Sequence, residues 1–238
     1  MESSRETSLH RTLVIMAKAP NPGAVKTRLA QRLPLPAVTG LYCCLLEDTV
    51  TLAQSLRGVQ LALMCPGSDV DDLAHFLGDA ARIVGQKGEG LAAGLTSVFA
   101  HFAAADQHHV IAFNSDTPHL PIAILEKAFQ ALLAHDVVIG PTHDGGYYLV
   151  GAKAAHPTLF ENDGMGTKSA LEALRARARL LELSTAFTDP FYDIDVAEDL
   201  IQLAAELRLA PDRAPRTAAW FVEWGETVAR LRPSLEAL

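Results

Sequence analysis

Short, uninterrupted apolar segments alternate along this 238-residue chain with longer segments whose apolar residues recur at helical spacing. Segments such as Thr12–Ala17 and Val59–Cys65 lack polar alternation, which is typical of strands buried on both faces. Such strands occur in parallel sheets, whose crossover connections place helices on both faces. The pattern therefore predicts an α/β protein with three layers, α/β/α, around a mostly parallel sheet.

The predicted elements follow one another in a regular order. Strands are expected at Thr12–Ala17, Val59–Cys65, Ala81–Gln86, His109–Asp116, Asp136–Pro141, Gly145–Ala152 and Arg179–Ser184. Helices are expected at Thr27–Leu33, Ala37–Leu56, Asp69–Leu77, Gly90–Ala105, Leu120–His135, Thr167–Ala178, Val196–Leu209 and Ala218–Leu231. The run Asp144-Gly145-Gly146 separates two neighbouring strands, and Asp-Gly pairs favour tight hairpins. One antiparallel excursion is therefore expected there.

We expect one domain over residues 12–208 and a C-terminal helical tail over residues 209–238 that packs on it. The 28 acidic and 20 basic residues give a net charge of −8. Without a broad basic face, the chain is a poor candidate for binding nucleic acid or an anionic membrane. No apolar stretch approaches the roughly 20 residues of a membrane span, and no signal-peptide core is visible. The expected setting is the cytoplasm, the expected partners are small molecules, and a homodimer is compatible with the chain.

Cations gather in the first turn, which is unexpected in an acidic chain. Lys18 follows the first predicted strand, and Lys26 and Arg28 follow Gly23 in a segment rich in proline and glycine. Backbone amides in such a turn, and the start of the helix predicted after it, attract anions. A phosphate or diphosphate would suit this turn, and so would a solvated surface loop. The spacing matches neither a Walker A loop nor a dinucleotide-binding motif.

Acidic residues follow later predicted strands, at the sheet edge where ligands bind in open α/β proteins. Asp116 follows Asn114 and Ser115. Opposite a phosphate-binding turn it could hold Mg²⁺ or Mn²⁺, or it could cap the next helix. Asp193 and Asp195 alternate on a short extended segment, so they are expected to point to opposite sides. One could complete a metal site with Asp116, and the other could cap the following helix.

The segment Gly140–Gly151 places His143 and Asp144 among glycines, just before Tyr147 and Tyr148. A hairpin accounts for the Asp-Gly pair, and tyrosine is common in strands. Glycine also allows a ligand to approach closely, and aromatic rings beside a carboxylate suit a hydroxyl-rich acceptor. Both interpretations stay open on the sequence alone.

Taken in order, these segments resemble a known pattern: K-x-P-x-P-G-x-x-K-T-R-L after the first strand, then S-D-x-P, D-G-G-Y-Y-L and D-x-D-x-x-x-D-L. Between Leu13 and Leu207 the chain resembles small bacterial proteins of the GT-A-like nucleotide-diphospho-sugar transferase superfamily, often labelled glycosyltransferases. Its first and last motifs are also similar to those of phospholactate guanylyltransferases and molybdenum-cofactor nucleotidyltransferases. The resemblance implies a GT-A, Rossmann-like fold and a transferase that uses a nucleotide donor.

The resemblance also implies roles for individual residues. Those implied to contact the donor phosphates are Gly23, Lys26 and Arg28, with Lys18 nearby. Asp116 and Asp195 would bind a divalent metal, Mg²⁺ or Mn²⁺, and Asp144 would face the acceptor, which makes Asp144 and Asp116 the implied catalytic residues. This chain departs from its relatives in Lys87–Leu95, where an acid and an arginine of a G-G-D-L-G-x-R-like run are missing. It also lacks a tryptophan that is common near Gly164–Ser169.

The lead hypothesis is a metal-dependent glycosyltransferase that moves a sugar from a nucleotide-sugar to a small hydroxyl acceptor. The alternative is a nucleotidyltransferase that joins a nucleoside triphosphate to a phosphorylated acceptor and releases pyrophosphate. That reaction needs cations on the acceptor side, for which Lys153, Lys168 and Arg175 are available. A third hypothesis is a nucleotide-binding regulator without transferase activity.

Overall fold

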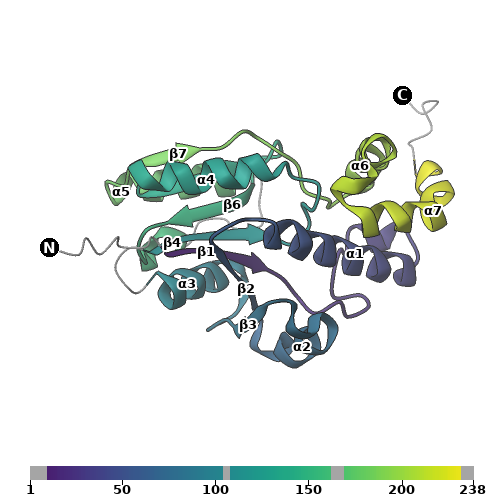
Figure 1. Ribbon diagram of the computed structural model, residues 1–238, viewed down its shortest axis with the longest axis horizontal. Coiled ribbons are helices and arrows are strands. Elements are labelled where there is room, and N and C mark those ends of the chain that lie inside the picture. Colours follow the sequence, from purple (N-terminus) through teal and green to yellow (C-terminus); the bar gives the residue numbers. More distant parts are fainter. Residues whose placement is uncertain (1–9, 104–107, 162–168, 232–238) are drawn as a thin grey trace, which may run out of the picture.

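The computed structural model describes residues 10–103, 108–161 and 169–231, which form a central sheet with helices on both faces (Figure 1). Within these residues the sheet has seven strands in the order β3-β2-β1-β4-β6-β5-β7. They are β1 (His10–Met16), β2 (Val59–Cys65), β3 (Arg82–Gly85), β4 (His108–Asn114), β5 (Val137–Pro141), β6 (Tyr147–Ala152) and β7 (Thr185–Phe187). Only β6 runs antiparallel to its neighbours, β4 and β5. The predicted three-layer fold and its antiparallel excursion are confirmed.

Apart from the helix predicted at Thr27–Leu33, the predicted helices lie close to the observed ones. The α-helices are α1 (Leu35–Gln54), α2 (Val70–Leu77), α3 (Gly90–Phe102), α4 (Ile122–Ala134), α5 (Ala170–Leu180), α6 (Ala197–Leu209) and α7 (Pro215–Ala229). Short 3₁₀ turns are η1 (Leu29–Gln31), η2 (Gly67–Asp69), η3 (Gly78–Ala80), η4 (Pro157–Phe160) and η5 (Pro211–Arg213).

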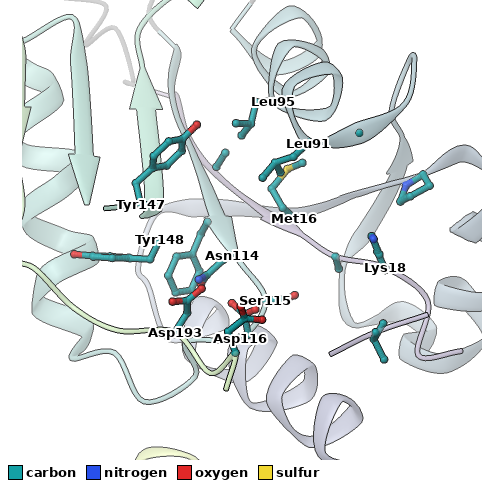
Figure 2. Close-up of a pocket in the computed structure, with 18 of the residues that line it drawn as sticks. Met16, Lys18, Leu91, Leu95, Asn114, Ser115, Asp116, Tyr147, Tyr148 and Asp193 are labelled. Atoms are coloured by element: carbon teal, nitrogen blue, oxygen red, sulfur yellow. The ribbon is translucent and has the colours of Figure 1, made fainter. Parts of the chain in front are cut away.

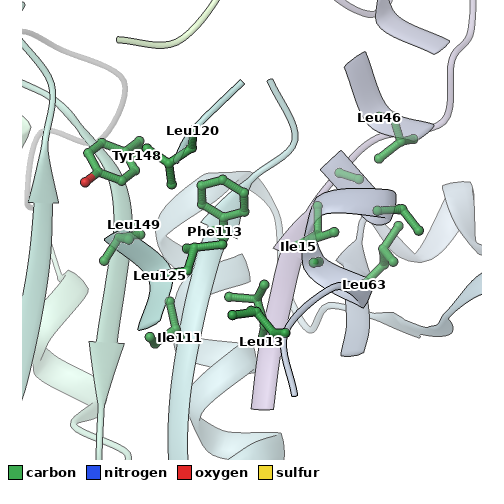
Figure 3. Packing of buried hydrophobic residues seen from close by; sticks show 14 of the residues in the cluster. Leu13, Ile15, Leu46, Leu63, Ile111, Phe113, Leu120, Leu125, Tyr148 and Leu149 are labelled. Carbon is green, nitrogen blue, oxygen red and sulfur yellow. The ribbon is translucent and has the colours of Figure 1, made fainter. Parts of the chain in front are cut away.

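Each face of the sheet carries its own apolar core, because successive side chains of a strand point to opposite faces. On one face, Leu13 and Ile15 of β1 pack with residues of α1, α2 and α4, and Figure 3 shows this cluster around Phe113. On the other face, Val14 packs with residues of α3, α5 and η4. Burial on both sides explains why the strands read as continuous apolar runs.

A third apolar cluster joins α1 to the C-terminal helices α6 and α7, which lie together at one end of the molecule (Figure 1). Trp220 of α7 donates from its indole nitrogen to the Ala37 carbonyl at 3.0 Å. The buried Asp48 carboxylate of α1 accepts from the backbone and hydroxyl of Thr217, both at 2.8 Å. Contrary to the expectation that no stretch approaches the length of a membrane span, helix α1 is long and apolar enough to cross a membrane by length and composition; 50% of its apolar 18-residue stretch is buried inside the protein.

Two predicted elements are wrong. Thr27–Leu33 is not a helix, because Lys26 has a left-handed φ of +48° and only the 3₁₀ turn η1 follows it. The residue before a proline disfavours helical backbone, so Leu33 ends the segment before Pro34. The strand predicted at 179–184 is also wrong: α5 continues to Leu180, and the strand begins only at Thr185. A short apolar run does not distinguish a last helical turn from a strand.

The close approach of β5 to β6 yields a testable expectation. A Cβ added at Gly140 would lie 2.5 Å from Cζ of Tyr148 and 2.7 Å from Cγ of Leu149. Overpacking a fixed core costs about 1–3 kcal/mol, so we expect Gly140→Ala to lower the free energy of unfolding by that amount in urea denaturation. The control is Gly225→Ala in α7, where a Cβ would meet no described atom within 4 Å. There alanine should stabilise by about 0.5–1 kcal/mol, and equal losses in both variants would contradict the argument.

Candidate active site

A cavity of about 1130 Å³ opens at the carboxyl ends of β1, β2 and β4. The start of β6 lies at the same edge, because that strand runs in the opposite direction. Figure 2 shows side chains from several of these segments around the cavity, among them Lys18, Asp116 and Tyr147. This edge is where open α/β sheets bind ligands.

The cavity brings together most of the residues singled out in the sequence. Those that line it are Lys18, Lys26, Arg28, Asp116, Asp144 and Asp195. Gly23 is not among the lining residues; its φ of +79° shapes the turn that leads to Lys26. Segments far apart in the sequence therefore supply the cations and the carboxylates of one cavity.

The cationic turn is held in place by side chains of the surrounding elements. The hydroxyl of Tyr42 on α1 accepts from the Lys18 backbone N–H at 3.0 Å and donates to its carbonyl at 3.2 Å. Asp69 accepts from the Ala19 backbone N–H at 2.8 Å. Since no α-helix starts at Thr27, a helix dipole cannot contribute here. Anion binding by this turn would depend on the side-chain cations and on loop amides.

The predicted phosphate-binding cations contact the predicted metal-binding carboxylates directly. The Lys26 ammonium pairs with Asp116 and lies 4.0 Å from Oδ1 of Asp195. Arg28 pairs with the other oxygen of Asp195. Burial alone would lower the pKa of Lys26, but the charge and hydrogen bond of Asp116, with the charge of Asp195, outweigh burial and raise that pKa. Lys26 is therefore a stable cation inside an acidic cluster.

Asp193 joins this cluster, a role that the sequence left open. Asp193 and Asp195 both line the cavity. The expectation that their side chains point to opposite sides, only one of them toward the site, is therefore wrong. Figure 2 shows Asp193 beside Asp116. Burial, followed by the charge of Asp116, raises the pKa of Asp193 to about 7. Three carboxylates therefore surround Lys26.

Neither helix-capping hypothesis is supported. Helix α4 begins after Pro121 without a side-chain cap, while Asp116 pairs with Lys26. At the start of α6 the capping carboxylate is Asp199, which accepts from the backbone N–H groups of Asp195 and Val196 at 2.8 Å each. Asp199 occupies the third position of the helix, where acids commonly reach back to the cap. This spacing was visible in the sequence and identifies Asp199 as the capping residue.

The segment that carries Asp193 and Asp195 is fixed against the end of β4. The backbone N–H of Ile194 donates to the Asp116 carbonyl at 3.2 Å. The fully buried ring of His119 packs on Phe191 and Tyr192, with ring centroids 5.0 and 4.6 Å apart. Burial lowers the pKa of His119 to about 3, so this ring is neutral.

Residues of the C-terminal region also contact the segment that carries Asp193 and Asp195 and help to fix its position. Glu206 of α6 accepts from the Tyr192 hydroxyl at 2.8 Å and pairs with Arg213 at 3.5 Å. The Arg213 guanidinium also donates to the His119 carbonyl. The position of the acidic cluster therefore depends on residues beyond the D-x-D-x-x-x-D-L motif.

Asp144 lines the cavity from the turn between β5 and β6. It is exposed and accepts from the Thr142 hydroxyl at 2.5 Å and from the Gly146 N–H at 3.2 Å. Both tyrosines that follow line the cavity, Tyr147 half-buried and Tyr148 buried. The Tyr148 hydroxyl is bonded to Thr188 at 2.6 Å and to the Asp189 carbonyl at 2.9 Å.

The segment Lys87–Leu95, in which this chain departs from the proteins it resembles, contributes to another wall of the cavity. Leu91 and Leu95 line it beside Met16, giving an apolar surface (Figure 2). The Gln86 amide donates to the carbonyls of Gly88 and Gly90, at 3.0 and 3.1 Å, which holds this loop. The second departure, the tryptophan missing near residues 164–169, lies mostly outside the described residues. Lys168 lies wholly outside them.

The acidic cluster offers oxygen atoms that could hold a divalent metal. Among the described residues, no three acidic, histidine or cysteine side chains form a ready metal site. Mg²⁺, however, often takes only one or two protein carboxylates, with phosphates and water completing its shell. Oδ1 of Asp116 is buried and has no hydrogen-bond partner among the described atoms, and neither has Oδ1 of the preceding Asn114. These oxygen atoms are of the type that Mg²⁺ prefers, and they fit a site in which phosphates and water complete the metal's shell.

Residues 49–167 match a family model described as "Uncharacterized protein conserved in bacteria (DUF2064)". No curated protein matches the chain significantly.

Solved structures show the same fold. A candidate nucleotide-diphospho-sugar transferase from Desulfovibrio desulfuricans G20 is 24% identical with a TM-score of 0.83, over 92% of this chain and 97% of that one. The 4-diphosphocytidyl-2C-methyl-D-erythritol synthase of Anaerococcus prevotii DSM 20548 is 14% identical with a TM-score of 0.57, over 84% and 97%. A CMP:2-keto-3-deoxy-manno-octonic acid synthetase complexed with CTP is 11% identical with a TM-score of 0.51, over 84% and 99%. The chain therefore has the fold shared by nucleotide-diphospho-sugar transferases and nucleotidyltransferases.

Proposed function

This chain belongs to the bacterial family DUF2064, and from its fold and its cavity we propose that it is a metal-dependent transferase that moves a sugar from a nucleotide-sugar to a small hydroxyl acceptor. The proposal rests on one observation. At the ligand-binding edge of the sheet, Lys26 and Arg28 lie in the same cavity as three carboxylates, those of Asp116, Asp193 and Asp195. A diphosphate with a divalent cation complements this mixture of charges.

Among the residues that the structure describes, which do not include Lys168, the distribution of charge in the cavity supports glycosyl transfer over nucleotidyl transfer. Among the described residues that line it, the lysines and arginines are Lys18, Lys26 and Arg28, all on the donor side. Lys153 and Arg175 do not line it. A phosphorylated acceptor would need cations beside Asp144, whereas a neutral hydroxyl acceptor would not.

In the proposed reaction, an acceptor hydroxyl oxygen forms a bond to the anomeric carbon of the sugar. The bond from that carbon to the phosphate oxygen breaks, and its electron pair leaves with the nucleoside diphosphate. Lys26 and Arg28 would stabilise the charge on this leaving group. Asp144 would orient the acceptor and take its proton. The Thr142 and Gly146 hydrogen bonds hold the Asp144 carboxylate in position for that task.

Asp116 and Asp195, with Asp193, would hold the metal of this reaction. A bound Mg²⁺ or Mn²⁺ supplies Lewis-acid stabilisation of the diphosphate charge. The second candidate, nucleotidyl transfer, is favoured by one feature: the donor side holds three cations, which also suits a triphosphate.

A panel of nucleotides and nucleotide-sugars with Mg²⁺ or Mn²⁺, followed by thermal unfolding, tests the proposal. A ligand at one hundred times its Kd adds about 2.7 kcal/mol of stability. For a chain of this size, that should raise Tm by about 5–10 °C. We expect stabilisation by nucleoside diphosphates and nucleotide-sugars only when metal is present. Stabilisation by one triphosphate alone would favour the nucleotidyltransferase, and no stabilisation by any member would contradict both.

A further inference from the structure

Lys26 lies where the three carboxylates of the cavity converge. Its ammonium pairs with Asp116, lies 4.0 Å from Asp195, and is attracted by the charge of Asp193. Its side chain is only 7% exposed, against 60% for Arg28. Arg28 reaches the cluster from solvent, while Lys26 is enclosed by it. A metal ion bound by these aspartates would therefore meet the Lys26 charge at close range.

The backbone at Lys26 is unusual as well. Its φ of +48° lies in the left-handed region, which residues other than glycine seldom adopt. Such conformations persist where surrounding contacts enforce them, and they concentrate at functional sites. Here the enforced conformation belongs to the residue whose side chain enters the acidic cluster.

In a purely structural ion pair, the polar atoms of both side chains would all have hydrogen-bond partners, but in this pair one carboxylate oxygen has none. Lys26 contacts Oδ2 of Asp116, while Oδ1 is buried without a hydrogen-bond partner among the described atoms. Two further carboxylates share the charge of the same ammonium. The cluster thus retains both an unsatisfied oxygen and an excess of negative charge.

We propose that Lys26 makes metal binding conditional on the nucleotide. While its ammonium pairs with Asp116, it repels a divalent cation from the aspartates. Donor phosphate offers the ammonium another partner, and the freed Asp116 carboxylate then becomes available to the metal. Metal and nucleotide therefore bind with positive coupling, and by linkage each raises the affinity of the other. This inference rests on the proposed function, since that supplies the phosphate.

The experiment measures the affinity for Mn²⁺ alone, by titration and detection of free Mn²⁺ by electron paramagnetic resonance. Wild type is compared with Lys26→Met, which removes the charge and keeps an unbranched side chain. The control is Lys18→Met, because Lys18 lines the same cavity without an ion pair to these aspartates. We expect Lys26→Met to bind Mn²⁺ at least about tenfold more tightly than wild type, and Lys18→Met to change by less than about threefold.

A second set of experiments repeats the Mn²⁺ titrations in the presence of each common ribonucleoside diphosphate. In wild type the diphosphates should raise the Mn²⁺ affinity strongly, and in Lys26→Met much less. Circular dichroism checks folding, and Lys26→Gln replaces Lys26→Met if the latter does not fold. Equal gains in Lys26→Met and Lys18→Met, or no gain in either, would overturn the inference. If wild type binds no diphosphate, the proposed function fails, while the Mn²⁺-alone comparison still decides the role of Lys26.

Discussion

Asp116→Asn should remove metal-dependent donor binding while the fold stays intact. The substitution keeps the size of the side chain but removes the negative charge at the centre of the acidic cluster. Losing even an outer partner of a metal site costs about 10–100-fold in affinity, so we expect the donor affinity with Mg²⁺ to fall by more than about 100-fold. Calorimetric titration with and without Mg²⁺, once a donor is identified, measures this effect.

The matched control is Asp189→Asn, which changes an exposed aspartate paired with Lys127 at 3.4 Å, on the surface. It should leave donor binding unchanged. A normal, metal-dependent affinity in Asp116→Asn would mean that Asp116 serves only as the partner of Lys26. In that case the metal assignment would be wrong.

Asp144→Asn should abolish transfer and spare donor binding. A carboxylate positioned to take the proton of an acceptor hydroxyl typically contributes about 10²–10⁴-fold to the rate. Asparagine retains a side-chain oxygen that can accept from Thr142 and Gly146, so the turn should persist. We therefore expect kcat to fall by that factor at nearly unchanged donor affinity. Both quantities are measured on the same variant.

The control here is His143→Asn, an exposed neighbour in the same turn that does not line the cavity. It should transfer at the wild-type rate. Loss of both binding and transfer in Asp144→Asn would assign Asp144 to the donor side or to the hairpin. Full transfer by Asp144→Asn would remove it from the mechanism and favour nucleotidyl transfer, since an anionic acceptor needs no such base.

Much of the fold follows from local patterns in the sequence. Continuous apolar runs place β1, β2 and β4 in a two-sided core, and Asp144-Gly145 marks the reversal before β6. The errors fall where local patterns compete. The run before β7 fits a helix end or a strand equally well, and the turn after Val25 is controlled by a left-handed lysine that no propensity predicts.

The sequence by itself also determined where the candidate site lies. Parallel strands bring their carboxyl ends to one edge, so the polar residues that follow β1 and β4 must meet there, whatever the details of the loops. The sequence could not show how those residues meet. The pair Lys26–Asp116 joins positions 90 residues apart, and Arg28–Asp195 joins positions 167 apart. Such pairs depend on strand order and loop backbone, which are set by the whole fold.

Strand order and loop backbone also explain why neighbouring residues of similar chemistry have different surroundings. Tyr147 and Tyr148 are adjacent and both line the cavity, yet Tyr147 is half-buried, whereas Tyr148 is buried and its hydroxyl is bonded to Thr188. Asp193 enters the acidic cluster because the segment that carries it is fastened to the Asp116 carbonyl and braced by Glu206 through Tyr192. Residue types and their order are local information, whereas burial and ion pairing are decided by what the rest of the chain places beside them.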